Sequence, residues 1–179
     1  MAKRHYVLYC DESAKHGKYY SDFYAGALVS APDQESIEAA LCAKKEELNL
    51  FAELKWTKIT ENYLDKYIEF MKFYFSFVAS GRLKIRVMFT QNMHRPRGLT
   101  QDHADNRYFL LYYQLIKHGF GFAHCNPNGL DKVFVSVFLD DMPDTREKVD
   151  KFRNYVSAIS QLPCLAGETY SFQNTKWPS

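Results

Sequence analysis

The alternation of apolar and polar residues predicts two strands near the start of the chain. Residues 6–10 and 23–29 are apolar and rich in β-prone side chains, and the polar stretch between them contains Gly17. Branched and aromatic side chains favour strands, and a glycine favours the turn that joins them. We therefore expect a β-hairpin here.

Two later segments also have strand patterns, but with different expected surroundings. Leu83, Ile85, Val87 and Phe89 alternate with Lys84 and Arg86, which indicates a strand with one solvated side. Residues 133–139 are almost continuously apolar and stop at Asp140-Asp141. An unbroken apolar run is typical of a strand that is covered on both faces.

Helical spacing separates these strands. Ser30-Ala31-Pro32-Asp33 has the residue types of a helix start, and Gly81 has those of a helix end. Helices are predicted from that start to about Leu50, from Leu64 to Val78, from Ala104 to His118, and onward from Asp144. The mixture predicts an α/β fold in which a mixed sheet is flanked by helices, with one domain over residues 1–168 and an irregular tail over 169–179.

Composition narrows the class of protein. The chain has 179 residues, 46% of them hydrophobic, which suits a single core, and its formal net charge of +2 requires any nucleic acid to bind at a local patch. No apolar run approaches the ~20 residues of a membrane span, and the start does not resemble an export signal. We expect a cytoplasmic protein without a membrane role. Its four separated cysteines should be free thiols rather than disulfide or zinc ligands.

Three acidic residues interrupt apolar or strand-like segments. Asp11 and Asp140 each end an apolar strand, and Glu53 lies in the short segment between two helices. If the two strands were neighbours, their carboxylates would meet at one edge and would remain ionised most easily around Mg²⁺ or Mn²⁺. Such a site is suited to phosphodiester hydrolysis. The alternative is that the three acids are turn and loop residues without chemistry.

Other polar groups have simpler explanations beside functional ones. Strand parity favours Asp140 over Asp141, because Asp140 shares a face with Ser136 and Phe138. A basic patch for phosphate could be formed by Arg95, Arg97, Lys84 and Arg86, although a solvated strand face explains the last two equally well. The cluster Asp102, His103, Asp105 and Asn106 needs no role beyond a helix start.

Two short motifs carry a resemblance to a known family. Tyr9-Cys10-Asp11-Glu12-Ser13 is followed by an apolar strand with Gly26 and then by Glu53-Leu54-Lys55-Trp56. In type and order these motifs resemble the bacterial family catalogued as domain of unknown function 3800. The resemblance extends over residues 6–167, although the middle third matches only in pattern.

That resemblance implies a ribonuclease-H-like fold and a metal-dependent nuclease that acts on DNA or RNA. It assigns Asp11, Glu53 and Asp140 as catalytic ligands of Mg²⁺ or Mn²⁺, and it places Lys55 against a phosphate. Without the resemblance, Lys55 is an ordinary exposed lysine.

The closing motif departs from the family. Cys164 stands where the family's last aspartate would fall, and Pro163 precedes it. A thiol is a poor ligand for Mg²⁺, so a truncated or degenerate family member with impaired catalysis is one expectation. Glu168 is the nearest acid that could substitute. The main alternative is a non-catalytic module that binds nucleic acid or protein through the same fold. An unrelated small-molecule enzyme is a third possibility.

Overall fold

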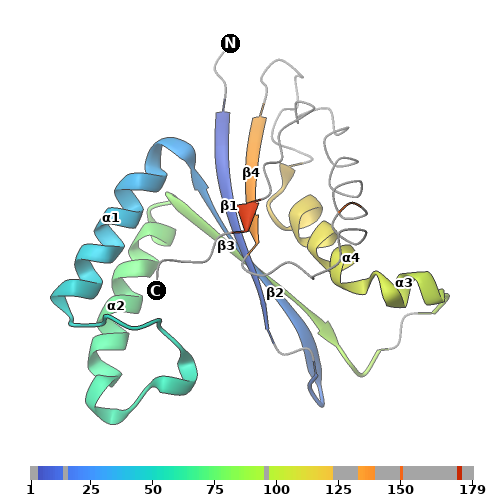
Figure 1. Ribbon diagram of the computed structural model, residues 1–179, viewed down its shortest axis with the longest axis horizontal. Helices are drawn as coiled ribbons and strands as arrows, with labels where there is room; N and C mark the ends of the chain where they lie inside the picture. The colour runs from blue at the N-terminus through green and yellow to red at the C-terminus, as the bar shows by residue number, and fades with distance from the viewer. Residues whose placement is uncertain are drawn as a thin grey trace.

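The structure is a computed structural model that describes residues 4–13, 16–94, 97–122, 133–139, 150 and 173–174. Among these residues, strands form a mixed sheet in the order β3-β2-β1-β4-β5, with helices on both of its sides (Figure 1). The strands are β1 (Arg4–Ser13), β2 (Tyr20–Ser30), β3 (Leu83–Gln91), β4 (Val133–Leu139) and β5 (Gln173–Asn174). The predicted α/β class with a mixed, helix-flanked sheet is confirmed.

The sheet combines antiparallel and parallel pairing. β1 and β2 form the predicted hairpin, with partners from Tyr6 and Ser30 to Ser13 and Phe23, and β3 pairs antiparallel with β2. β4 lies on the other side of β1 and runs parallel to it. The odd-numbered residues of β4, from Val133 to Leu139, are buried, and the residues between them are half-buried. The prediction of a strand covered on both faces is therefore confirmed.

Two helices cover one face of the sheet. The predicted first and second helices are confirmed as α1 (Ala31–Glu47) and α2 (Glu61–Ala79). Ile37 and Phe77 from these helices pack against Val7, Val29 and Leu83 of the strands. The helices also meet through Lys44, whose ammonium lies 2.5 Å from a carboxylate oxygen of Glu69. Gly81 follows α2 with a φ of 75°, as expected for a glycine at a helix end.

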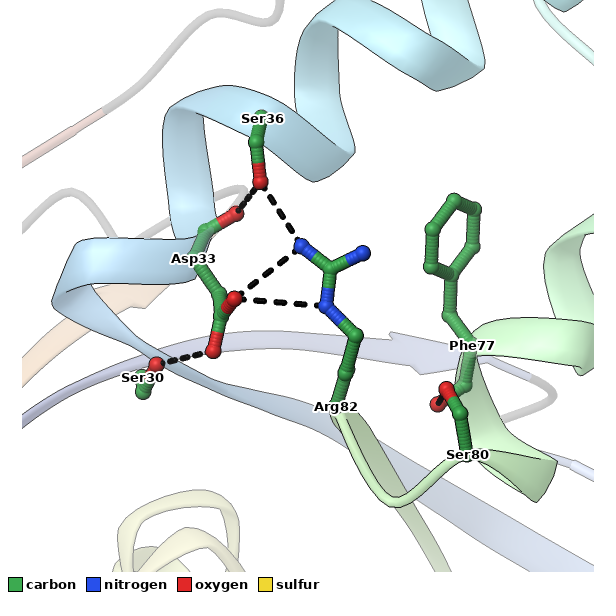
Figure 2. A network of polar contacts seen from close by, with 6 residues as sticks. All are labelled: Ser30, Asp33, Ser36, Phe77, Ser80 and Arg82. Carbon is green, nitrogen blue, oxygen red and sulfur yellow. Dashed lines mark hydrogen bonds and ion pairs between the residues drawn. The ribbon is translucent and has the colours of Figure 1, made fainter.

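A polar network fastens the start of α1 to the turn between α2 and β3 (Figure 2). Arg82 donates to Asp33 Oδ1 from Nε at 3.2 Å and from Nη2 at 3.0 Å, and it also donates to Ser36 Oγ at 2.8 Å. Ser30 Oγ donates to the other Asp33 oxygen at 2.6 Å. The hydrogen bonds from Ser30 and Arg82 lower the pKa of Asp33. The Arg82 guanidinium lies 5.5 Å from the Phe77 ring centre, so Arg82 also contacts α2.

The other face is covered by three short helical segments. They are α3 (Gln101–Asp105), α4 (Arg107–Gln114) and the π-helix η2 (Leu115–Gly119). Phe109, Tyr112 and Ile116 pack there against Leu8 and Val137 of the sheet. The two groups of helices therefore lie on opposite faces of the sheet (Figure 1).

The predicted third helix over residues 104–118 is wrong as a single element. Helical structure begins at Gln101 and is interrupted at Asn106, which is only 5% exposed. Asn106 Nδ2 donates to the carbonyl oxygen and to Oδ1 of Asp102, each at 2.9 Å. The backbone of Asn106 departs from helical angles, with a φ of −103° and a ψ of 11°, although its N–H still donates to the Asp102 carbonyl at 3.0 Å and its carbonyl accepts from the Leu110 N–H at 3.1 Å. The acidic residue Asp102 therefore has a structural partner at the helix start.

The end of the chain is described at few positions. Gln173 and Asn174, within the predicted irregular tail, form β5 and pair parallel with Phe138 and Leu139. The predicted helix from Asp144, apart from Asp150, and the Pro163-Cys164 motif lie outside the described residues. Cys10 and Cys42 are free thiols, as predicted, with Cys10 buried and Cys42 exposed.

Candidate active site

Asp11 lies near the carboxyl end of β1, at the centre of the sheet. Its Cα partner in β2 is Ala25, and on the other side Cys10 pairs with Leu139 of β4 in parallel register. Cys10 and Leu139 are the residues directly before Asp11 and Asp140. The two strands predicted to bring these acids together are therefore adjacent and parallel. Asp140 itself lies outside the described residues.

Alternation along β1 places Asp11 on the same face as Val7 and Tyr9, which is the face covered by α1 and α2. Helix α1 reaches the position of Tyr9, where Gln34 Nε2 donates to the tyrosine oxygen at 2.6 Å. Asp11, one step further along this face, is exposed, and its Oδ1 accepts the backbone N–H of Glu12 at 2.8 Å. The helices thus cover the first half of this face and leave Asp11 open to solvent.

Apolar residues surround Asp11 on this uncovered half. Ala25 pairs with Val87 of β3, so Asp11, Ala25 and Val87 form one row across three strands. Val87 and Phe89 are 57% and 51% exposed. Phe23 stacks on Phe89 with ring centres 5.5 Å apart. We call the residues Asp11, Phe23, Ala25, Val87 and Phe89 the open sheet face.

The exposure of β3 differs from the sequence prediction. The strand itself is confirmed, but its apolar side is exposed at Val87 and Phe89, while Met88 on the opposite side packs into the core beside α4. Lys84 and Arg86 are exposed, as predicted for a solvated side, and Arg86 also donates to the Gly119 carbonyl at 3.0 Å. The pattern did not predict the exposure of Val87 and Phe89 because it records polarity without showing where the covering helices end.

A β-bulge in β2 presents Phe23 to the open sheet face. The register between β2 and β3 shifts between Ser21 and Tyr24, and Asp22 has a φ of 51°. Arg107 of α4 donates from Nη2 to Asp22 Oδ2 at 2.8 Å and to Thr90 Oγ1 at 3.1 Å. Bulges commonly redirect a side chain beside a functional site. Arg107 was not identified from the sequence, and no spacing pattern marks it.

Glu12 lies on the opposite face of β1 and was assigned no role from the sequence. It shares a face with Leu8 and Cys10, both buried. Its Oε2 accepts a hydrogen bond from the Tyr112 hydroxyl and lies 3.4 Å from the Tyr108 hydroxyl. Because alternation along the strand places Glu12 on the face of Leu8 and Cys10, the sequence could have identified Glu12 as an acid that needs buried donors.

The tyrosines around Glu12 form a closed cluster. The ring of Tyr24 lies edge-on to Tyr112, with ring centres 4.7 Å apart, and Tyr108 contacts both rings. Burial, followed by the charge of Glu12, raises the pKa of Tyr24 and of Tyr108 above the usual tyrosine value. Burial also raises the pKa of Tyr112. These hydroxyls therefore remain protonated, and those of Tyr108 and Tyr112 donate to the Glu12 carboxylate.

The second predicted ligand, Glu53, lies in the segment between α1 and α2. Its Oε2 is 2.8 Å from Lys55 Nζ, and the two side chains are 71% and 48% exposed. The predicted metal ligand and the predicted phosphate contact are thus paired with each other. Close by in sequence, Phe51 and Trp56 are 72% and 88% exposed. This segment presents charge and aromatic surface to solvent, while its Leu54 packs against the cluster of Leu48, Leu50 and Phe70.

The predicted set of metal ligands, Asp11, Glu53 and Asp140, is only partly described by the structure. Among residues 4–13, 16–94, 97–122, 133–139, 150 and 173–174, no group of three or more histidine, cysteine, aspartate or glutamate residues is arranged to hold a metal ion. That range includes Asp11 and Glu53 but not Asp140. Of the predicted basic patch, Lys84 and Arg97 are exposed, and Arg95 lies outside the described residues.

Comparison with protein-family models and with the sequences of curated proteins gives no match for this chain. The resemblance carried by the two short motifs therefore stays a prediction. In the part of the chain that the structure describes, no helix has the length and apolarity required to cross a membrane.

Proposed function

We propose that this protein is a nuclease or phosphodiesterase that depends on a divalent metal ion and acts on single-stranded nucleic acid at the open sheet face. Asp11 and Asp140 would be the central ligands and Glu53 a third, with Mg²⁺ or Mn²⁺ as the ion. The observation that carries this proposal is the parallel register of β1 and β4, in which Cys10 is the partner of Leu139.

The topology supports a ribonuclease-H-like fold for this proposal. Three antiparallel strands are followed by two strands parallel to the first, in the order β3-β2-β1-β4-β5, which is the strand order of ribonuclease-H-like sheets. Helices α1 and α2 lie between β2 and β3 in sequence, as an addition to that plan. In sheets with parallel central strands, ligands bind beyond the carboxyl ends of those strands.

The residues on the Asp11 face suit a hard cation. Asp11 is an exposed carboxylate, and Ser136 and Phe138 of β4 lie on the same face as Val7 and Tyr9, their register partners. Strand alternation predicts that Asp140 continues that face. Carboxylate oxygens are preferred ligands of Mg²⁺ and Mn²⁺. A bound ion would supply a Lewis acid and an activated water for phosphodiester hydrolysis.

The Glu53–Lys55 pair is compatible with two roles. An exposed ion pair contributes about 0–1 kcal/mol, so exchanging it for new partners costs little. Glu53 would leave Lys55 to become a ligand, and Lys55 would then be able to contact a phosphate of the substrate. Both residues lie in the segment between α1 and α2. The exposed rings of Phe51 and Trp56 in that segment would contact the same strand of nucleic acid.

The open sheet face supports single-stranded nucleic acid as the substrate. Phe23 and Phe89 are stacked at an interplanar angle of 30°, and Tyr20 lies edge-on to Phe89 with ring centres 5.2 Å apart. Unpaired bases stack on exposed aromatic rings of sheets, whereas the bases of a duplex are stacked on one another. A base on Phe89 would place the backbone near the row that contains Asp11.

The same aromatic rings favour one alternative, a module that binds single-stranded nucleic acid without cleaving it. Binding by stacking needs no metal ion, and Lys55 would then remain paired with Glu53. Cys164, in place of the family's last aspartate, also fits this alternative because a thiol is a weak ligand for Mg²⁺. The two functions differ in whether binding and cleavage depend on metal and on Asp11.

The test combines metal binding and cleavage. Saturating Mn²⁺ should stabilise the wild-type protein, by about 2.7 kcal/mol at a hundredfold excess over Kd, because the ion binds only the folded site. Asp11→Asn and Asp140→Asn should abolish this rise in Tm. Glu46→Gln, a one-charge change on the exposed surface of α1, is the control and should keep it. Labelled single-stranded DNA and RNA should be cleaved only by variants that bind the ion.

An equal Mn²⁺ response in Asp11→Asn and wild type would contradict the proposal, because the ion would then bind elsewhere. Salt-sensitive binding of oligonucleotides without cleavage in any metal, retained in Asp11→Asn, would establish the non-catalytic alternative. Absence of any binding at low salt would exclude both functions.

A further inference from the structure

Helix α2 has a second apolar face that no described residue covers. Its buried residues, Phe70 and Phe77, face the core. On the outer side, Leu64, Ile68, Met71 and Phe75 are 45%, 42%, 42% and 50% exposed. At 3.6 residues per turn these four side chains lie within about 60° of one another around the helix axis, so they form one stripe. We call them the α2 stripe.

The spacing of the α2 stripe is that of a helix-pairing seam. Its members are separated by four, three and four residues, which is the alternation of apolar positions in a coiled-coil heptad. A surface helix with only structural duties has one apolar stripe that faces the core and a polar outer side. Large apolar residues gathered on the outer side of a helix mark an interaction surface.

The separations of four, three and four residues are in the same order from either end of the α2 stripe. If a second α2 packs antiparallel about a two-fold axis between Ile68 and Met71, Leu64 faces Phe75 of the second copy and Ile68 faces Met71. A surface that is complementary to itself under a two-fold rotation is what a symmetric dimer requires. Packing against an unrelated partner would not need this symmetry.

Charge follows the same symmetry. Asp65 and Lys72 are exposed, and each directly follows a member of the stripe, so both border it on the same side. In an antiparallel pair, Asp65 of one copy lies within about 3 Å along the axis of Lys72 of the other, given a rise of 1.5 Å per residue. Two opposite-charge pairs would therefore flank the seam, and bordering charges of this kind set partner choice and orientation.

We propose that the α2 stripe is a homodimer interface, in which the α2 helices of two copies pair antiparallel. This inference does not rest on the proposed function, because it uses none of the residues of the candidate active site. The stripe is about 16 Å long, so a contact between two such stripes is small and we expect the dimer to be weak. Self-association should therefore be visible in the micromolar range.

Sedimentation velocity over a micromolar concentration series tests the interface. The wild-type protein should shift from monomer to dimer, and Ile68→Glu should remain a monomer because it places a charge in the seam of each copy. Leu99→Glu, at a 52% exposed apolar position away from α2, is the matched control and should dimerise like the wild type. A wild-type protein that stays monomeric at every concentration would overturn the proposal.

A charge swap tests which partner occupies the stripe. Asp65→Lys and Lys72→Asp each place like charges opposite one another twice, and each should raise the dimer Kd roughly tenfold. The double variant restores both opposite-charge pairs and should return Kd to within about threefold of wild type. These exposed substitutions do not threaten folding, so this test remains valid if Ile68→Glu fails to fold. A dimer insensitive to all three charge variants would place the interface elsewhere and overturn the proposal.

Discussion

Asp11 and Glu12 are consecutive acids on one strand, yet they lie in opposite surroundings. Glu12 points toward α4, where Tyr108 and Tyr112 direct their hydroxyls at its carboxylate. Asp11 points to the other face, beyond the reach of α1, and is exposed among the residues of the open sheet face. A one-residue step along a strand exchanges a packed environment for a solvated one.

The different surroundings of the two acids give Glu12 a part in stability and Asp11 a part in binding. A carboxylate held by buried donors is costly to remove because its partners lose their hydrogen bonds. Asp11 is exposed, so a cation or substrate can reach its carboxylate. We therefore expect the tyrosine side of the sheet to govern unfolding and the open sheet face to govern binding.

The largest expected effect is the loss of a buried ring on the tyrosine side. Tyr112 is fully buried, so Tyr112→Ala should lower the free energy of unfolding by about 3–5 kcal/mol, the usual cost of removing a large aromatic side chain from a core. Phe89→Ala removes a ring that is 51% exposed and should cost clearly less. Urea unfolding of both variants measures the two losses of unfolding free energy. Equal losses would mean that the open sheet face is packed like a core.

Alkaline pH should destabilise the same side. Because the folded-state pKa of Tyr112 lies above its ordinary value of 10.0, its contribution to stability is complete below pH 10 and is lost as the pH rises further. Replacing the tyrosine by phenylalanine removes that titration. Unfolding measured between pH 9 and 11 should therefore be less steep in pH for Tyr112→Phe, by about 1.4 kcal/mol per pH unit above pH 10. Parallel profiles for the two proteins would contradict the raised pKa.

The adjacent acids provide the most direct comparison. Glu12→Gln keeps the shape but weakens charge-assisted hydrogen bonds, and it should cost about 1–2 kcal/mol of unfolding free energy. Asp11→Asn should change stability by less than about 0.5 kcal/mol in the absence of metal. Thermal and urea unfolding without divalent ions measures both. A reversed order of the two losses would refute the assignment of stability to one face and binding to the other.

The smallest effect concerns ligand binding at the open sheet face. Phe89→Ala should weaken binding of a single-stranded oligonucleotide by about 1 kcal/mol, roughly fivefold, because one stacking ring of the Phe23–Phe89 pair is lost. Fluorescence anisotropy at fixed salt measures this change. Met93→Ala, at a 74% exposed apolar position outside the pair, is the control and should bind like the wild type.

Most of the fold could be predicted from periodicity. The hairpin, the first two helices and the covered strand β4 each follow from patterns that depend on burial within a single element. The third helix was predicted wrongly as one element because the backbone of Asn106 departs from helical angles, which helical spacing does not register. Exposure along β3 also could not be predicted, because it depends on where α1 and α2 end relative to the strand.

The candidate site could be predicted less completely. Strand ends identified Asp11, whereas the pairing of β1 with β4 was a condition of that argument and comes from the structure. The ion pair between Glu53 and Lys55 forms across a loop whose conformation no pattern specifies. The bulge at Asp22 and its contact with Arg107 join residues 85 positions apart, so only the folded chain brings them together.

The rate at which a reagent modifies the Cys10 thiol can report how often the sheet opens. Its thiol is buried in the central strand, and burial raises its pKa, so a thiol reagent reacts with it only when the sheet opens. Cys42 on the exposed side of α1 needs no such opening. The ratio of the two modification rates therefore measures how often the centre of the sheet opens.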